Sequence, residues 1–261
     1  MAGATLHKIN LGSLTAQASQ WPLDSDLQTL VFIHGAGFHA GFWHPQESLA
    51  NQFNVIFLNL PGRQSAAPSE GLIERYADEA AKALKQLETN VIIIGHSMGG
   101  AVAQAIAHAN PPWLQAIVLA CTGAKLKVAP VVNQLLTQGA SVFMQMFTQT
   151  GPGLDIKQMA LLGNQMAKTE TGLTDFLACN RFDFMDRVNE IRTPCLVMTG
   201  DKDLLTPEKY SHFLHEHITG SELSLVKDTG HLLPWESPIT FNRLISEFAR
   251  RHEPDSVSIT D

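Results

Sequence analysis

Cysteine is scarce in this chain of 261 residues, with only Cys121, Cys179 and Cys195. An odd number with no Cys-x-x-Cys spacing supports neither a disulfide framework nor a zinc site. No apolar run approaches the roughly 18 residues that a membrane span needs. The first residues, MAGATLHKINLGSLTAQ, lack a basic segment followed by an apolar one, so no signal peptide is expected. These absences predict a soluble, cytoplasmic protein that does not associate with a membrane.

Positive charge is also in short supply. Lysine and arginine number 18 against 25 aspartates and glutamates, which gives a net charge of −7. Such a balance argues against binding to nucleic acid or anionic lipid. No G-x-G-x-x-G follows a strand and no G-x-x-x-x-G-K-[ST] occurs, so no nucleotide cofactor is implied. The histidines at 212, 215 and 217 lack a zinc-binding register and favour a solvated helix face, so neither a metal nor a cofactor is expected.

Short apolar runs bounded by Gly, Pro or Asn are the dominant pattern, and 44% of the residues are hydrophobic. They predict strands at 29–33, 55–60, 91–95, 116–121, 195–200 and 222–226. Most runs are continuous rather than alternating, as expected of strands covered on both faces. Helical patterns alternate with them at 73–88, at about 98–109, at 207–218 and at 236–252. This order predicts an α/β fold with a mostly parallel central sheet flanked by helices, to which the first 20 residues could add one or two antiparallel strands at an edge.

The alternation breaks between the sixth strand and residue 190. This stretch holds five of the eight methionines, and no charged residue occurs from Val128 to Leu154. We interpret 124–190 as a small helical cap over the carboxyl edge of the sheet, inserted into a core domain of 1–123 and 191–252. Residues 253–261 are expected to be a loose tail. Most apolar cap residues belong to ordinary packing, while a few soft side chains are expected to line an apolar substrate pocket.

The segment VIIIGHSMGGAVAQAIA, residues 91–107, places Ser97 between a strand and a helix with Gly95 and Gly99 around it. A tight turn of this kind exposes the hydroxyl and directs backbone N–H groups at a reacting carbonyl. Side chains at the two glycine positions would crowd the turn. G-x-S-x-G alone arises by chance in about one chain in ten of this length, so the motif needs independent support.

Three other segments supply that support. In VFIHGAGFHAGFW a strand opens into a glycine-rich loop, where the N–H of Ala36 can face that of Met98 to form an oxyanion hole. CLVMTGDKDLLTP carries Asp203 just after a strand, and DTGHLLPWESP carries His231 after the last strand. The chain order Ser97, Asp203, His231 is the one expected of an α/β-hydrolase triad.

Strand-HG-loop, G-H-S-M-G-G, G-x-x-D-x-x-x-P and G-H-x-x-x-x-E-x-P together resemble the α/β-hydrolase fold family, in particular its small capped esterases, lactonases and related carbonyl hydrolases. The resemblance covers nearly the whole chain and is weakest in the cap. It implies that Ser97 is the nucleophile, His231 the general base and then acid, and Asp203 the group that orients the histidine. The N–H groups of Ala36 and Met98 would hold the oxyanion.

The loop after the fourth strand departs from the family pattern D-x-P-G-x-G-x-S. It has Asn59 in place of the acidic residue and Gln64 in place of a second glycine. Because of this departure the sequence does not predict the geometry of this loop or of the pocket beside it. The positions of the three triad residues are not affected.

Several nearby residues compete for the same roles. Asp201 also follows the strand closely, but the G-x-x-D spacing and the later proline favour Asp203, and Asp228 lies too close to the His231 turn. His34 and His96 occupy motif positions where histidine more often braces loops by hydrogen bonding than transfers protons.

The function expected from the sequence is hydrolysis of a carboxylic ester by an acyl-enzyme route. The substrate is expected to be small, uncharged and moderately apolar, because the stretch of the cap from Val128 to Leu154 carries no charge. A CoA thioester is less attractive, since phosphates favour clustered Lys or Arg and only Arg63, Lys125 and Lys127 are found near the predicted entrance. C–C bond hydrolase, thioesterase, perhydrolase and lyase activities use similar triads and remain alternatives, as does a ligand-binding receptor with a relic triad.

The sequence does not predict the oligomeric state. The expected substrate-binding residues are Gly37, Phe38, Phe143, Met146, Phe147, Leu204 and Leu232.

Overall fold

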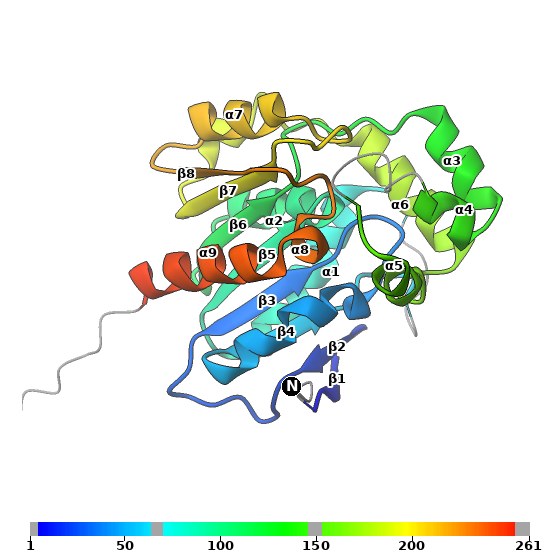
Figure 1. Cartoon of the computed structure of the whole chain (residues 1–261). Helices are drawn as coiled ribbons and strands as arrows, with labels where there is room; N and C mark the ends of the chain where they lie inside the picture. Colours follow the sequence, from blue (N-terminus) through cyan, green and yellow to red (C-terminus); the bar gives the residue numbers. More distant parts are fainter. Residues whose placement is uncertain (1–4, 64–69, 146–152, 254–261) are drawn as a thin grey trace, which may run out of the picture.

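One eight-stranded sheet forms the centre of the computed structural model, which describes residues 5–63, 70–145 and 153–253 (Figure 1). The strands are β1 (His7–Leu11), β2 (Leu14–Ala18), β3 (Thr29–Ile33), β4 (Asn54–Leu58), β5 (Val91–His96), β6 (Leu114–Ala120), β7 (Cys195–Gly200) and β8 (Glu222–Val226). Their order in space is β1-β2-β4-β3-β5-β6-β7-β8. β2 is antiparallel to β1 and β4, and the other neighbours are parallel. The expected mostly parallel sheet with antiparallel edge strands is confirmed.

Burial explains the continuous apolar runs of the central strands. Every residue of β3, β4 and β5 is buried, as expected of strands with helices on both faces. The register aligns the carboxyl ends of neighbouring strands, since Ile33 pairs with Gly95 and His96 pairs with Ala120. The loops that leave these strands therefore open at one edge of the sheet.

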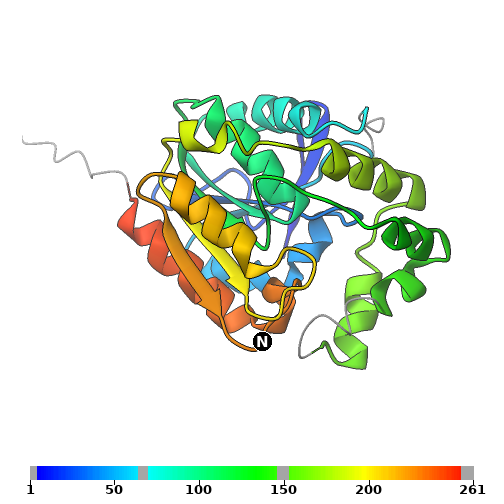
Figure 2. The ribbon, with the colours of Figure 1, turned by 90° about the horizontal axis from the view of Figure 1, so that it is seen from above.

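The helices that cover the sheet are η1 (Ala40–Asn51), α1 (Ile73–Lys85), α2 (Met98–His108), η3 (Val188–Glu190), α7 (Glu208–His217), α8 (Leu233–Glu236) and α9 (Pro238–Arg251). α1 packs with α2 on one face, whereas α9 packs with η1 on the other (Figure 1, Figure 2). The helix expected over 236–252 begins only at Pro238, because Ser237 leaves the helical conformation with φ −138° and ψ 61°. Proline at the first helical position fits the start of α9.

Four α-helices precede η3 between β6 and β7 in the described part of the chain: α3 (Pro130–Thr137), α4 (Ala140–Gln145), α5 (Ile156–Gly163) and α6 (Thr169–Arg181). They lie beyond the carboxyl ends of the strands (Figure 1, Figure 2). A helical cap inserted after the sixth strand is therefore confirmed, while its exact limits at 124 and 190 stay a prediction. Met146, Phe147, Gln64 and the expected tail beyond Glu253 lie outside the described residues.

Cys121, Cys179 and Cys195 are buried free thiols. No helix among the described residues has both the length and the apolar character needed to cross a membrane.

Candidate active site

Ser97 lies in a strained turn between β5 and α2. Its φ of 53° and ψ of −116° fall where non-glycine residues rarely occur, at a cost of about 1–3 kcal/mol. Hydrogen bonds hold this conformation: Ser97 N donates to the carbonyl of Ala120 at 2.9 Å, and Thr122 Oγ1 donates to the carbonyl of Ser97 at 2.8 Å. The surrounding structure therefore keeps the serine at the carboxyl edge of the sheet.

The two glycines around Ser97 are required by close backbone approach. A Cβ on Gly95 would lie 2.3 Å from the carbonyl oxygen of Gly99, and a Cβ on Gly99 would lie 2.0 Å from that of Ile33. Both distances are far below van der Waals contact, and both clashes are with backbone atoms, of α2 in the first case and of β3 in the second. The G-x-S-x-G spacing is thus a packing requirement of this turn.

Asp203 and His231 form a buried hydrogen-bonded pair. His231 Nδ1 donates to Asp203 Oδ2 at 2.9 Å, and the two side chains are 6% and 0% exposed. Asp203 Oδ1 accepts from the backbone N–H groups of Leu205 and Thr206 at 2.9 Å each, and Thr206 Oγ1 donates to Oδ2 at 2.7 Å. Burial raises the pKa of Asp203, but the charge and hydrogen bond of His231 and the bonds from Thr206 outweigh it and lower the pKa below its usual value. Asp203 is therefore a carboxylate at neutral pH.

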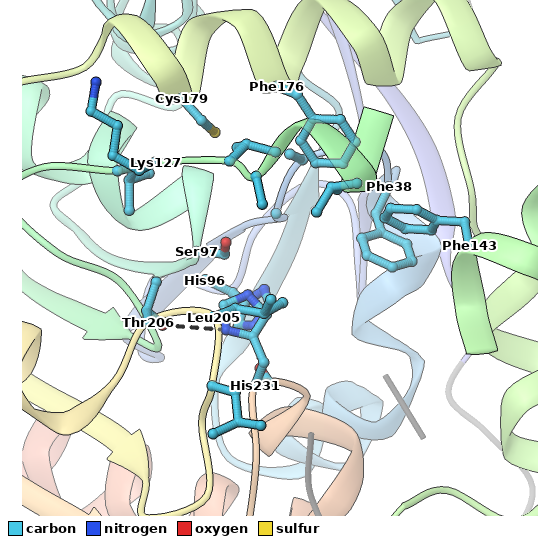
Figure 3. A pocket seen from close by; sticks show the side chains of 17 residues that line it. Phe38, His96, Ser97, Lys127, Phe143, Phe176, Cys179, Leu205, Thr206 and His231 are labelled. Carbon is cyan, nitrogen blue, oxygen red and sulfur yellow. Dashed lines mark hydrogen bonds between the residues drawn. The ribbon is translucent and has the colours of Figure 1, made fainter. Parts of the chain in front are cut away.

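Ser97 and His231 face one cavity, although they lie 134 positions apart in the sequence. Figure 3 shows the hydroxyl of Ser97 directed into this cavity, with His231 beside it and Phe38 and Phe176 across from it. The three residues that the sequence singled out are thus brought together. The rival Asp201 instead lies 3.9 Å from the ammonium group of Lys202 on the turn.

The cavity has a volume of about 190 Å³ and lies between the sheet edge and the cap. Of the residues expected to bind substrate, Phe38, Phe143 and Leu204 line it, and so does Ala36. Other lining residues that sequence reasoning did not assign to the pocket are Gly35, His96, Leu126, Val128, Ala129, Val132, Phe176, Cys179, Leu205 and Thr206. Lys127 is the only permanently charged residue among the described residues of the lining.

Gly37 and Leu232 do not line the cavity, contrary to expectation. Gly37 N donates to Asp175 Oδ2 at 2.8 Å and its carbonyl accepts from Ala167 N at 2.8 Å, so this residue faces the cap. Leu232 is buried at the start of α8, where its N–H donates to Glu236 Oε1 at 3.0 Å. Both residues therefore form hydrogen bonds within the loops around the site and do not contribute to the wall of the cavity.

Cations expected near the entrance are mostly engaged elsewhere. Arg63 is buried and forms an ion pair with Asp175, which removes it from the entrance. Lys125 forms an ion pair with Asp183. Only Lys127 borders the cavity, and its ammonium group lies 3.4 Å from the carbonyl oxygen of Asn180.

Asn59, the departure from the family pattern, links two segments by hydrogen bonds. Its Oδ1 accepts from Ala40 N at 2.8 Å, while its Nδ2 donates to Thr15 Oγ1 at 3.1 Å. Both polar atoms of the amide therefore have a partner at this buried position between β2 and η1.

His34 and His96 brace loops around the site. His34 Nδ1 donates to the carbonyl of Gly35 at 2.9 Å, and its Nε2 accepts from Leu60 N at 3.3 Å. His96 Nε2 donates to the carbonyl of His231 at 2.8 Å. Burial, followed by the charge of the nearby His231, lowers the pKa of His96 to about 3, and burial likewise lowers the pKa of His34. Both rings are therefore neutral at physiological pH.

The low pKa of His96 predicts an acid-dependent loss of stability. Below about pH 6.5 the unfolded chain protonates this histidine and the folded chain does not, so the free energy of unfolding falls by about 1.4 kcal/mol per pH unit from this group. His96→Gln keeps a donor for the His231 carbonyl but cannot titrate. Urea unfolding of both proteins at about pH 7, 6 and 5 should give the shallower pH dependence for the variant. Parallel slopes would mean that His96 titrates normally in the folded state.

No group of three or more His, Cys, Asp or Glu side chains that could hold a metal ion occurs among the described residues. On α7, His215 bonds to Ser221 Oγ at 3.0 Å and His217 stacks on Phe213.

The chain matches the Alpha/beta hydrolase family model over residues 30–244 and belongs to that family. It is 27% identical over 276 residues to 2-hydroxy-6-oxononadienedioate/2-hydroxy-6-oxononatrienedioate hydrolase 1 of Dechloromonas aromatica (strain RCB), covering 92% of this chain and 93% of that protein. Its structure is similar to that of a thermophilic esterase, with a TM-score of 0.80 and 25% identity over 95% of this chain and 98% of the other. The enol-lactonase from Burkholderia xenovorans LB400 shares the fold, with a TM-score of 0.79 and 18% identity over 94% and 100% of the two chains.

Proposed function

We propose that this protein is a serine hydrolase that cleaves small, uncharged carboxylic esters through an acyl-enzyme on Ser97. The observation that carries the proposal is a serine hydroxyl on a strained turn that shares a cavity with His231, whose other ring nitrogen is bound to the buried carboxylate of Asp203. A serine needs such a base to become nucleophilic, and the base needs an orienting group.

In the acylation step Ser97 Oγ attacks the ester carbonyl and His231 Nε2 takes its proton. The bond from His231 Nδ1–H to Asp203 fixes the tautomer in which Nε2 can accept. The N–H groups of Ala36 and Met98 stabilise the oxyanion. Met98 is the first residue of α2, so its N–H has no acceptor within the helix, whereas the N–H of Gly37 is already bound to Asp175.

The imidazolium of His231 then donates its proton to the departing alcohol, which leaves the acyl group on Ser97 and completes acylation. In the deacylation step water enters the space that the alcohol has left, and His231 Nε2 removes a proton from this water as it attacks the acyl carbon. The second tetrahedral state collapses to release the acid, and the imidazolium returns a proton to Ser97 Oγ.

The cavity supports a small substrate with little charge. Its volume of about 190 Å³ lies below the range of roughly 300–1,000 Å³ that drug-sized ligands occupy. Phe38, Phe143 and Phe176 contribute apolar walls, and soft Cys179 adds to them.

A second candidate is C–C bond hydrolysis, which the similarity to the Dechloromonas aromatica enzyme favours. The name of that enzyme specifies a dioate, a substrate with two carboxylates. Binding two carboxylates calls for more than one cation or strong donor group, and Lys127 is the only lasting positive charge in the described lining. This difference supports the ester over the dioate for the present chain.

Steady-state hydrolysis of p-nitrophenyl esters of increasing acyl length tests the proposal. We expect kcat/KM to rise about fourfold per methylene, since each buried methylene contributes about 0.8 kcal/mol. The rise should stop at roughly four to eight carbons because the cavity is small. Phe176→Ala should move this limit to longer chains, whereas Leu177→Ala, on the exposed side of the same helix, should not.

Cleavage of 2-hydroxy-6-oxononadienedioate without turnover of any ester would replace the proposal by the second candidate. A single turnover that stops at one equivalent per chain would instead support a ligand-binding receptor.

A further inference from the structure

Asp175 of the cap helix α6 is a fully buried carboxylate outside the proposed catalytic residues. It accepts from Gly37 N at 2.8 Å and from Tyr76 Oη at 2.7 Å, and it pairs with both terminal nitrogens of Arg63. Arg63 is also buried, and its Nε donates to the carbonyl of Phe38 at 2.9 Å. The two members of this ion pair thus bind two neighbouring residues of the loop that follows β3: Asp175 binds the N–H of Gly37, and Arg63 binds the carbonyl of Phe38.

The backbone of the cap is paired with the same loop. Ala167 N donates to the carbonyl of Gly37 at 2.8 Å, and His39 N donates to the carbonyl of Gln165 at 3.1 Å. Phe38 and Met166 form an isolated antiparallel bridge. The loop is therefore held by the cap as well as by the sheet.

These contacts determine the orientation of the peptide that carries the Ala36 N–H. The carbonyl of that peptide belongs to Gly35, and it accepts from His34 Nδ1 at 2.9 Å and from Phe38 N at 3.4 Å. Phe38 is in turn fixed through its own carbonyl by Arg63. The next peptide is fixed by the bond from Gly37 N to Asp175.

We propose that Asp175 and Arg63 are positioning residues that hold the Ala36 N–H in place for the oxyanion, so that docking of α6 controls catalytic competence. This inference rests on the proposed function. An apolar pair could fill the same volume, but it would offer no acceptor to Gly37 N and no donor to the Phe38 carbonyl. The following residue, Phe176, lines the cavity, so a substrate that contacts α6 also favours the docked helix.

The test uses Asp175→Asn and Arg63→Lys in the full chain. Asparagine removes the charge that Arg63 requires, whereas lysine keeps the charge but cannot form the forked contact together with the bond to Phe38. Asp183→Asn is the matched control, because it removes an exposed ion pair with Lys125 that joins the beginning of the cap segment to the stretch after α6. Thermal melting and circular dichroism give the folded fraction of each protein.

The first readout is the rate at which a fluorophosphonate labels Ser97, measured by intact mass. In this reaction the serine oxygen bonds to phosphorus, fluoride leaves and the hydroxyl proton passes to His231, while the phosphoryl oxygen occupies the oxyanion hole.

The second readout is the separate effect of each substitution on kcat and on KM for p-nitrophenyl butyrate. Because small misplacements of catalytic groups cost up to about 10²-fold, we expect labelling and kcat to fall by roughly 10- to 100-fold in both variants. KM should change by less than about threefold, and Asp183→Asn should match the parent.

Labelling of folded Arg63→Lys at the parental rate would overturn the inference, and so would a loss that only follows the folded fraction. If Asp175→Asn does not fold, Arg63→Lys alone decides. A parent that turns over no ester but labels at Ser97 faster than the two variants would refute the proposed function and still support the positioning role.

Discussion

Replacement of Ser97 by alanine is expected to lower kcat for p-nitrophenyl butyrate by roughly 10³-fold or more. The variant loses the only group that the proposed mechanism uses to form a covalent bond with the acyl carbon. It keeps the cavity, the His231–Asp203 pair and the oxyanion donors, which alone give modest catalysis over water. KM should therefore change little compared with kcat.

Cys179→Ala is the matched control for this loss. Cys179 places a thiol in the described lining of the cavity, but burial followed by the charge of Asp175 raises the pKa of this thiol. The thiolate is the reactive form of cysteine, so this residue should be inert. We expect kcat of this variant to stay within about twofold of the parent. Equal activity of the Ser97→Ala variant and the parent would contradict the assignment of the nucleophile.

Gly99→Ala is expected to destabilise the folded protein by roughly 4 kcal/mol or more, the range of the most damaging single substitutions. The new methyl group would lie 2.0 Å from the carbonyl oxygen of Ile33 and 2.9 Å from that of His34. β3 is a fully buried central strand, so relief of the clash requires α2 to move away from the sheet. Urea unfolding should show a much lower midpoint, or no folded protein at all.

The control for this effect is Gly163→Ala in α5. Its Cβ would meet nothing closer than the Met144 side chain at 4.0 Å, and alanine favours a helix over glycine by about 1 kcal/mol. This variant should be as stable as the parent or more so. A Gly99→Ala protein with the parental unfolding midpoint would show that the turn around Ser97 is looser than described above.

The sequence predicts the fold well where local patterns carry the information. Continuous apolar runs identify the buried parallel strands, and the stripe through Ile73, Ala77, Ala80 and Leu84 identifies the buried face of α1. Ser97, Asp203 and His231 could be located because each follows a strand and the carboxyl ends of parallel strands meet at one edge. These features depend on neighbours in the sequence and on one general rule of sheet geometry.

Contacts between distant segments could not be predicted in this way. Asp175 is 112 positions from Arg63, and nothing in the pattern of α6 distinguishes it from a solvated helix residue. Gly37 was expected to touch substrate, yet the cap captures both its N–H and its carbonyl. Thr206 carried a usable signal, since a hydroxyl three residues after Asp203 can cap that carboxylate locally. The remaining contacts of the site depend on how the cap packs against the sheet, and this packing is a tertiary feature that local sequence patterns do not encode.

The most direct test of the account is the mass of the protein quenched with acid during turnover of p-nitrophenyl butyrate. The account predicts a fraction of chains heavier by one butyryl group, located by peptide mapping on the segment that contains Ser97 and missing from the Ser97→Ala variant. Acylation of another residue, or the same adduct on the Ser97→Ala variant, would contradict it.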